Sequence, residues 1–143
     1  MRLVVLTGVF SPAEIAIARE LAEDNLAKGA VASGYHFLIA DGPAGIEGYA
    51  AFGPIPGTDA GYELYWIAVH PAARRSGLGH RLQAAAEEAA RSFGAAFMKA
   101  ETSTVPDYAA ARNFYTSQGY SLVLEVPDWH RPGDGMAMFY KRL

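Results

Sequence analysis

The chain contains no cysteine in its 143 residues, which excludes thiol nucleophiles, disulfides and thiolate metal sites. Its four histidines, His36, His70, His80 and His130, show neither the HxxxH nor the HExxH spacing of a metal centre. The carboxylates likewise lack the ligand spacing of a metal-binding loop. We therefore predict that the protein holds no metal.

Long hydrophobic runs and an excess of one charge are also missing. No apolar stretch reaches the ~18 residues of a membrane span, and residues 1–8 lack a signal-peptide cleavage pattern. The net charge is −3 at pH 7, and acidic and basic residues are interspersed, so no basic face for nucleic acid is visible. We expect a cytoplasmic protein with neither a membrane nor a nucleic acid as partner.

Length and composition fit one compact domain. With 51% hydrophobic and 19% charged residues, the chain can bury a core large enough to fold alone, and we predict a single domain over residues 1–143. Weak alternation over residues 2–7 suits a short first strand. Ser11-Pro12-Ala13-Glu14 is a capping box with proline at the first helical position, so a helix begins here, and we expect Gly29 to end it.

Hydrophobic periodicity predicts the remaining elements. The turn-forming residues 41–45 separate two strand runs that should pair as an antiparallel hairpin. One later helix places apolar residues at spacings of three and four, with Gln83, Glu87, Glu88 and Arg91 on its polar side. The predicted strands are 35–40, 46–52, 62–69, 96–100, 120–126 and 136–143, and the predicted later helices are 78–93 and 106–118. This order indicates an α/β fold with one mixed, mostly antiparallel sheet and helices on both faces.

The most informative segment joins the strand at residues 62–69 to the helix that follows it. It reads His70-Pro71-Ala72-Ala73-Arg74-Arg75-Ser76-Gly77-Leu78-Gly79. Helix N-termini present unpaired N–H groups and about half a positive charge, and glycine lets a polyanion approach the backbone closely. The segment is therefore predicted to hold a phosphate group, whereas the alternative is a solvated helix entry.

The run Arg74-x-x-Gly77-x-Gly79 resembles the pyrophosphate-binding loop of the GNAT superfamily of N-acetyltransferases. A second motif agrees with it, because Ala111-Arg112-Asn113-Phe114-Tyr115 followed by Gly119-Tyr120 is similar to the family's helix ending in Phe-Tyr. The resemblance spans about residues 35–143. It implies the GNAT fold and an enzyme that uses acetyl-CoA to acetylate an amine.

The resemblance also implies which residues hold the coenzyme. Backbone groups of the glycine loop would bind the pyrophosphate, with the two arginines adding charge, and the preceding strand would pair with the pantetheine arm. The predicted coenzyme-binding residues are Ile67, Val69, Arg74, Arg75, Ser76, Gly77, Leu78 and Gly79. The acceptor would be a primary amine of a small molecule or peptide that attacks the thioester directly.

Two glutamates are candidates for the general base. Glu63 is predicted by period two to share one strand face with Tyr65, Ile67 and Val69, and it matches a strand glutamate used as base in part of the superfamily. A protonated amine of pKa ~10 cannot attack, so a carboxylate acting directly or through water is required. Glu101, at the end of the next strand, is the competing base. The alternatives are a solvent-exposed Glu63 and a structural Glu101.

The candidate general acid is Tyr115, which occupies the tyrosine position of the Phe-Tyr motif. In many family members this tyrosine protonates the departing thiolate, and a phenol of pKa ~10 can do so at neutral pH. The alternative is an aromatic residue that packs at the helix end with its hydroxyl hydrogen-bonded. The family's usual asparagine seven residues earlier is Tyr108 here, so an asparagine contact to the coenzyme is not carried over.

The segment 127–135 between the last two strands is predicted to be a long loop that helps to form the acceptor pocket. It is longer than an ordinary hairpin connection and combines aromatic and charged residues, of which Asp128 and Trp129 are the predicted acceptor contacts. The alternative is a solvated crossover. The family resemblance also allows a homodimer.

Two other functions compete with acetyl transfer. A dinucleotide-binding domain would have a third glycine where this chain has Leu82, and the antiparallel strands do not suit a doubly wound sheet. A non-catalytic acyl-CoA-binding or regulatory module on the same fold is the remaining alternative, because a fold does not by itself define a function.

Overall fold

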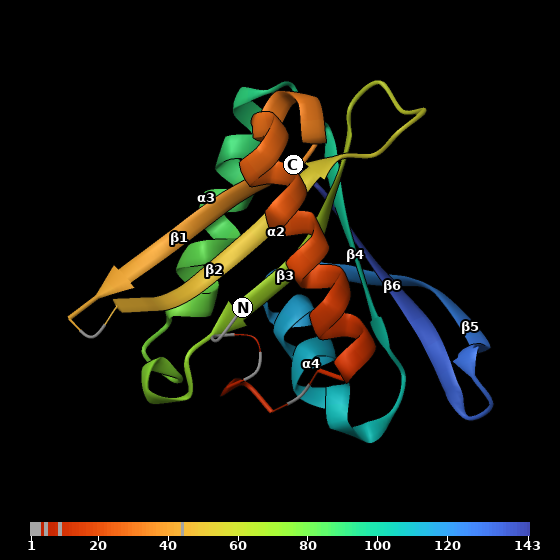
Figure 1. Ribbon diagram of the computed structural model, residues 1–143. Helices are drawn as coiled ribbons and strands as arrows, with labels where there is room; N and C mark the ends of the chain where they lie inside the picture. The colour runs from red at the N-terminus through yellow and green to blue at the C-terminus, as the bar shows by residue number, and fades with distance from the viewer. Residues whose placement is uncertain (1–3, 5, 9, 44) are drawn as a thin grey trace.

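A computed structural model describes residues 4, 6–8, 10–43 and 45–143. In this part of the chain the strands form one six-stranded sheet in the order β1-β2-β3-β4-β6-β5 (Figure 1). β3 and β4 are parallel, and the other neighbouring strands are antiparallel. The helices are α2 (Pro12–Ser33), α3 (Leu78–Ser92) and α4 (Ala109–Ser117), and the strands are β1 (His36–Gly42), β2 (Gly45–Pro54), β3 (Gly61–Val69), β4 (Phe97–Ser103), β5 (Ser121–Arg131) and β6 (Asp134–Arg142).

Helices cover both faces of the sheet, as the sequence predicts. α3 packs Leu78, Leu82 and Ala86 into the larger of two hydrophobic cores, and α4 adds Tyr115 to the same core. A smaller core on the α2 side contains Tyr49 and its neighbours Ala51 and Ala68, with partly buried aromatic residues packed against it. Burying apolar surface on both faces explains why a single sheet forms one stable domain. The predicted fold class is therefore confirmed.

β3 and β4 diverge, and this divergence creates the opening for a site. Their parallel register covers Gly61–Leu64 and Phe97–Ala100. β3 then continues to Val69 beside β2, while β4 continues to Ser103 beside β6. Figure 1 shows the two strands separating toward the ends that face α4. We call the space between these separated ends the fork.

A β-bulge in β3 changes which side chains face the fork. Ala51 pairs with Trp66 and Phe52 pairs with Leu64, so the register skips Tyr65. One extra residue in a strand shifts the alternation of every side chain after it.

The bulge overturns one expectation about Glu63. Its neighbours Tyr62 and Leu64 pack against the larger core, so the Glu63 side chain points to the α2 side of the sheet. Beyond the bulge, Ile67 and Val69 pack against the larger core on the α3 side. The prediction that Glu63 shares one face with Ile67 and Val69 is therefore wrong.

Helix α2 begins as predicted and is interrupted at the predicted end, Gly29. The Ser11 side chain accepts a hydrogen bond from the backbone N–H of Glu14, and the Glu14 side chain accepts one from the backbone N–H of Ser11, which together form the capping box. Gly29 leaves helical geometry with φ 79°, yet the helix resumes and ends at Gly34, whose φ is 74°. Gly29 therefore interrupts the helix where the sequence predicts its end, and a second short helical run follows up to Ser33. Of the strand predicted over 2–7, residues 2, 3 and 5 lie outside the described residues, whereas Val4 and Leu6 are helical, so the strand prediction is wrong there.

The predicted long loop between the last strands is also wrong. β5 extends to Arg131 and β6 begins at Asp134, which leaves a tight turn at residues 132–133. Asp128 has φ 55°, and its carboxylate accepts a hydrogen bond of 2.7 Å from the backbone N–H of Gly133. This local hydrogen bond stabilises the turn, and the register between the two strands shifts from Val126 to Arg131.

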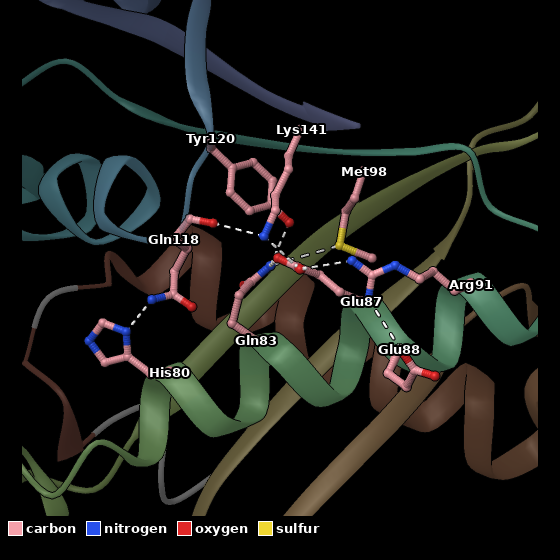
Figure 2. A network of polar contacts seen from close by, with 9 residues as sticks. All are labelled: His80, Gln83, Glu87, Glu88, Arg91, Met98, Gln118, Tyr120 and Lys141. Atoms are coloured by element: carbon pink, nitrogen blue, oxygen red, sulfur yellow. Dashed lines mark hydrogen bonds and ion pairs between the residues drawn. The ribbon is translucent and has the colours of Figure 1, made fainter. Parts of the chain in front are cut away.

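The polar side of α3 is partly buried, contrary to expectation (Figure 2). Gln83 is fully buried and donates a hydrogen bond of 2.6 Å to the Tyr120 hydroxyl. Glu87 accepts one of 2.7 Å from Lys141, whose ammonium also donates to the Gln118 carbonyl at 2.8 Å. These contacts attach α3 to β6 and to the turn after α4. Two residues assigned to the polar side of α3 therefore hold this helix against the rest of the domain.

Candidate functional site

A cavity of about 740 Å³ lies in the fork. Val69, Arg74 and Gly79 line it where β3 meets the glycine loop. Glu63 and Glu101 line it where β3 and β4 begin to separate. The cavity therefore joins the predicted phosphate loop to both predicted bases.

The glycine loop reaches α3 through two left-handed residues. Arg75 has φ 63° and Gly77 has φ 76°, and Gly77 is the N-cap of α3. A positive φ suits glycine but is uncommon for arginine, so the Arg75 backbone is held in a costly conformation. Among the described residues, no side chain caps α3, so its first N–H groups stay available to an anion. This end of α3 has the physical features of a phosphate site.

The predicted coenzyme residues divide into two groups. Ile67, Val69, Arg74 and Gly79 line the cavity, and Arg74 also donates a hydrogen bond of 2.8 Å to the Thr7 carbonyl. The others lie outside that lining: Arg75 and Ser76 are exposed, Gly77 is half-buried and Leu78 belongs to the hydrophobic core. These four residues can contribute backbone N–H and carbonyl groups to the loop.

Gly79 leaves limited room at the start of α3. A Cβ atom built there would lie 3.4 Å from Cε2 of Phe114 and 3.7 Å from Cγ2 of Val69. These are ordinary contact distances, so alanine fits, whereas a larger side chain must project into the cavity or displace Phe114. Substitutions of Gly79 can therefore test whether a ligand occupies the glycine loop.

The two candidate bases are joined by a lysine that sequence reasoning missed. Lys99 Nζ lies 3.0 Å from Oε1 of Glu63 and 2.7 Å from Oε1 of Glu101. Burial raises the pKa of Glu63, while the hydrogen bond and charge of Lys99 oppose that rise and the charge of Glu101 adds to it. For Lys99, burial lowers the pKa, but the two carboxylates outweigh burial and raise it. Lys99 therefore keeps its charge and holds both carboxylates at the vertex of the fork.

Tyr115 lines the cavity from the buried face of α4. Its ring packs near Phe114, Tyr120 and Phe139, with centroid distances of 5.6, 5.9 and 5.5 Å. Burial raises the pKa of Tyr115, so its hydroxyl is protonated at neutral pH. Tyr115 therefore packs in the hydrophobic core and also lines the cavity.

A second contact that was not predicted closes the α2 side of the site. The Tyr108 hydroxyl donates a hydrogen bond of 2.8 Å to Oε1 of Glu14, and both residues line the cavity. Burial and this carboxylate raise the pKa of Tyr108. Glu14 was assigned only to the capping box, and a contact between residues 94 positions apart leaves no local pattern to reveal it.

The hairpin residues lie differently from expectation. Trp129 is 60% exposed, and the Asp128 carboxylate is engaged in its own turn. Both lie outside the cavity lining, which His130 enters instead. These residues lie where the register between β5 and β6 shifts, between Val126 and Arg131.

Two further features bear on cofactors and membranes. Within the described ranges, no three histidine, aspartate or glutamate side chains gather as metal ligands. Among the helices of those same ranges, none is both long enough and apolar enough to cross a membrane.

Comparison with known families agrees with this geometry. The model of the acetyltransferase (GNAT) domain matches residues 33–122. The chain therefore belongs to the GNAT family of acetyltransferases, and the resemblance seen in its two motifs is confirmed. A search of the curated proteins gave no match.

Solved structures place the fold in the same family. A protein from Desulfovibrio desulfuricans that is assigned to the GNAT family is 39% identical, with a TM-score of 0.94 over 99% of this chain and 88% of that one. A ribosomal-protein-alanine N-acetyltransferase from Brucella melitensis is 23% identical, with a TM-score of 0.72 over 85% of this chain and 77% of that one. An aminoglycoside 6′-N-acetyltransferase complexed with coenzyme A is 19% identical, with a TM-score of 0.68 over 76% and 73%. At such identities the latter two show the shared fold.

Proposed function

We propose that the protein transfers an acetyl group from acetyl-CoA to a primary amine of a small molecule or peptide. The observation that carries the proposal is the fork, where one cavity connects the uncapped start of α3 to two carboxylates and a buried tyrosine. The aminoglycoside acetyltransferase of the same fold holds coenzyme A, which supports this choice of cofactor. Acetyl-CoA is the cofactor that we assign to the cavity.

The coenzyme would lie along β3. Its pyrophosphate would accept hydrogen bonds from the first N–H groups of α3, and Arg74 would add positive charge beside it. The pantetheine arm would follow β3 from Val69 toward the vertex of the fork, because β4 has left that edge of β3 beyond Leu64. Backbone groups of Ile67 and Val69 would bind its amides as a neighbouring strand would. This arrangement brings the thioester toward Glu63 and Glu101.

The chemical step then needs a base and an acid. The acceptor arrives as an ammonium ion and loses one proton to Glu63 or Glu101, directly or through water. The neutral nitrogen attacks the thioester carbonyl carbon and gives a tetrahedral adduct with a positively charged nitrogen and a negatively charged oxygen. The nitrogen then loses its second proton to water, and the adduct collapses to the amide as the carbon–sulfur bond breaks. Tyr115 donates its proton to the departing thiolate. The products are an acetylated amine and free coenzyme A.

Coenzyme binding is tested first. Calorimetry should show that the wild-type protein binds coenzyme A, that Gly79→Ala binds it nearly as well, and that Gly79→Asp binds it about 100-fold more weakly, a loss of about 2.7 kcal/mol. The aspartate would place a like charge against the pyrophosphate, whereas the Cβ of alanine fits. Absence of binding heat with the wild-type protein would overturn the proposal.

Turnover is tested second. Release of the coenzyme thiol from acetyl-CoA should require an amine and should yield the acetylated amine by mass spectrometry. Binding of coenzyme A without turnover on any amine would favour the non-catalytic acyl-CoA-binding module over the enzyme.

A further inference from the structure

Aromatic rings form part of the cavity lining. Tyr35 and Tyr65 meet edge to face with centroids 5.3 Å apart, and Phe10 and Trp66 do the same at 5.0 Å. Burial, with Glu63 and Tyr35 nearby, raises the pKa of Tyr65 to about 12, so its ring stays neutral. Aromatic faces attract cations and also bury apolar groups.

Apolar side chains of α2 complete this wall. Ile17 and Leu21 line the cavity on the side that Tyr108 and Glu14 close by their hydrogen bond. The Ile17 side chain is 49% exposed, so a ligand in the cavity would bury more of its apolar surface. The wall therefore suits a ligand with an apolar body.

The charges around this wall are mostly negative. Glu14, Glu63, Glu101 and Asp107 line the cavity. The ammonium of Lys99 lies between Glu63 and Glu101, so its charge is already shared by two carboxylates. Arg74 belongs to the glycine loop and donates a hydrogen bond to the Thr7 carbonyl, and His130 is the remaining basic side chain in the lining. A cation is therefore favoured beside this wall, and an anion is repelled there.

We propose that the acceptor is a small amine with an apolar or aromatic body and no carboxylate beside its amino group. This inference rests on the proposed function and specifies its substrate class. The carboxylates attract the ammonium form of the amine, the rings and the α2 side chains hold its body, and a carboxylate on the ligand meets like charge. A cavity of about 740 Å³ matches one drug-sized ligand, and the pantetheine arm would occupy part of it. The space left suits a small molecule and not a folded protein segment.

A panel of four amines tests the substrate class with the wild-type protein and acetyl-CoA. Phenylalaninamide and phenylalanine differ in the presence of a carboxylate, while phenethylamine and spermidine differ in the apolar body. Rates are expressed per concentration of neutral amine, which removes differences in amine pKa. We expect kcat/KM for phenylalaninamide to exceed that for phenylalanine by at least about tenfold, since each tenfold corresponds to 1.4 kcal/mol and like charges cost more than that. Phenethylamine should likewise exceed spermidine.

Variants test whether the named side chains produce this preference. Glu14→Gln keeps the capping-box hydrogen bonds but removes one charge, so it should reduce the preference for phenylalaninamide over phenylalanine severalfold. Tyr35→Ala should raise the KM for phenethylamine while leaving the KM for acetyl-CoA unchanged. Glu88→Gln, on the exposed side of α3, is the matched control and should change neither.

The outcomes separate the inference from the proposed function. Turnover with equal kcat/KM for phenylalaninamide and phenylalanine, or with spermidine as the better substrate, would overturn the substrate class and leave acetyl transfer standing. Turnover with the expected preference, unchanged in both Glu14→Gln and Tyr35→Ala, would overturn the assignment to this wall. Binding of coenzyme A without turnover on any amine would overturn the proposed function and the inference together.

Discussion

Replacing Lys99 by methionine should move the pH dependence of the reaction to higher pH. Lys99 Nζ lies 3.0 Å from Glu63 and 2.7 Å from Glu101, and its side chain is 16% exposed. Methionine keeps most of the apolar stem but removes the positive charge between the two carboxylates. The variant therefore changes the electrostatics at the vertex of the fork more than its packing.

The expected size follows from the surroundings of Glu63. A positive charge at hydrogen-bond distance lowers the pKa of a carboxyl group by about 1 to 3 units, which corresponds to about 1.4 to 4 kcal/mol. Without Lys99, burial and the charge of Glu101 both raise the pKa of Glu63 with nothing to oppose them. The base is then protonated over a wider acidic range. The pH midpoint of the acidic limb of kcat/KM should therefore shift upward by about 1 to 3 pH units.

The assay is thiol release with one acceptor from about pH 5 to about pH 9, with Lys99→Arg as the charge-conserving control. Ionisation of the acceptor is common to all variants, so a difference between their limbs reports the enzyme. Lys99→Arg should retain the wild-type limb. A Lys99→Met protein that is folded and active with an unmoved limb would refute the role of this carboxylate pair as base. A severe loss in Glu101→Gln but not in Glu63→Gln would assign the base to Glu101.

Three further predictions follow from buried and exposed side chains. Tyr115→Phe should lower kcat by about 100-fold or more and leave coenzyme affinity unchanged by calorimetry, whereas wild-type kcat would exclude it as the acid. Lys141→Met removes from the buried carboxylate of Glu87 its partner at 2.7 Å and leaves Arg91 at 3.8 Å and Gln83 at 3.3 Å, so urea denaturation should show a loss of about 2 kcal/mol, reduced by these remaining contacts and because Lys141 is 25% exposed; an unchanged midpoint would contradict this. Trp129→Ala should leave the acceptor KM unchanged, since Trp129 is 60% exposed outside the cavity lining, and a raised KM would return it to the acceptor site.

The features predicted correctly from the sequence are those with a local cause. The capping box at Ser11 depends on residues three positions apart, and the start of α3 depends on the glycine beside it. The hairpin of β1 and β2 follows from alternation and a turn. Such signals lie within a few residues, so they can be identified before any tertiary contact is known.

The features that were missed depend on contacts between distant segments. Lys99 follows no motif, and its role appears only when β4 pairs with β3 and brings it between Glu63 and Glu101. Burial of Gln83 depends on Tyr120, 37 positions away. The short second helical run that follows the predicted break at Gly29 and ends at the Gly34 cap was also missed.

The motifs of the site can be recognised in the sequence, but the fork can be recognised only in the structure. β3 is rich in aromatic and β-branched residues and β4 is not, yet nothing in the local pattern of either strand limits their parallel register to Gly61–Leu64 and Phe97–Ala100. The limit comes from their other neighbours: β2 holds β3 to Val69, and β6 holds β4 to Ser103. Because each strand keeps its antiparallel partner while losing its parallel one, an edge of β3 becomes available beside the glycine loop. A ligand that pairs with that edge replaces the missing strand, and the carboxylates at the vertex then lie where its reactive end must stop.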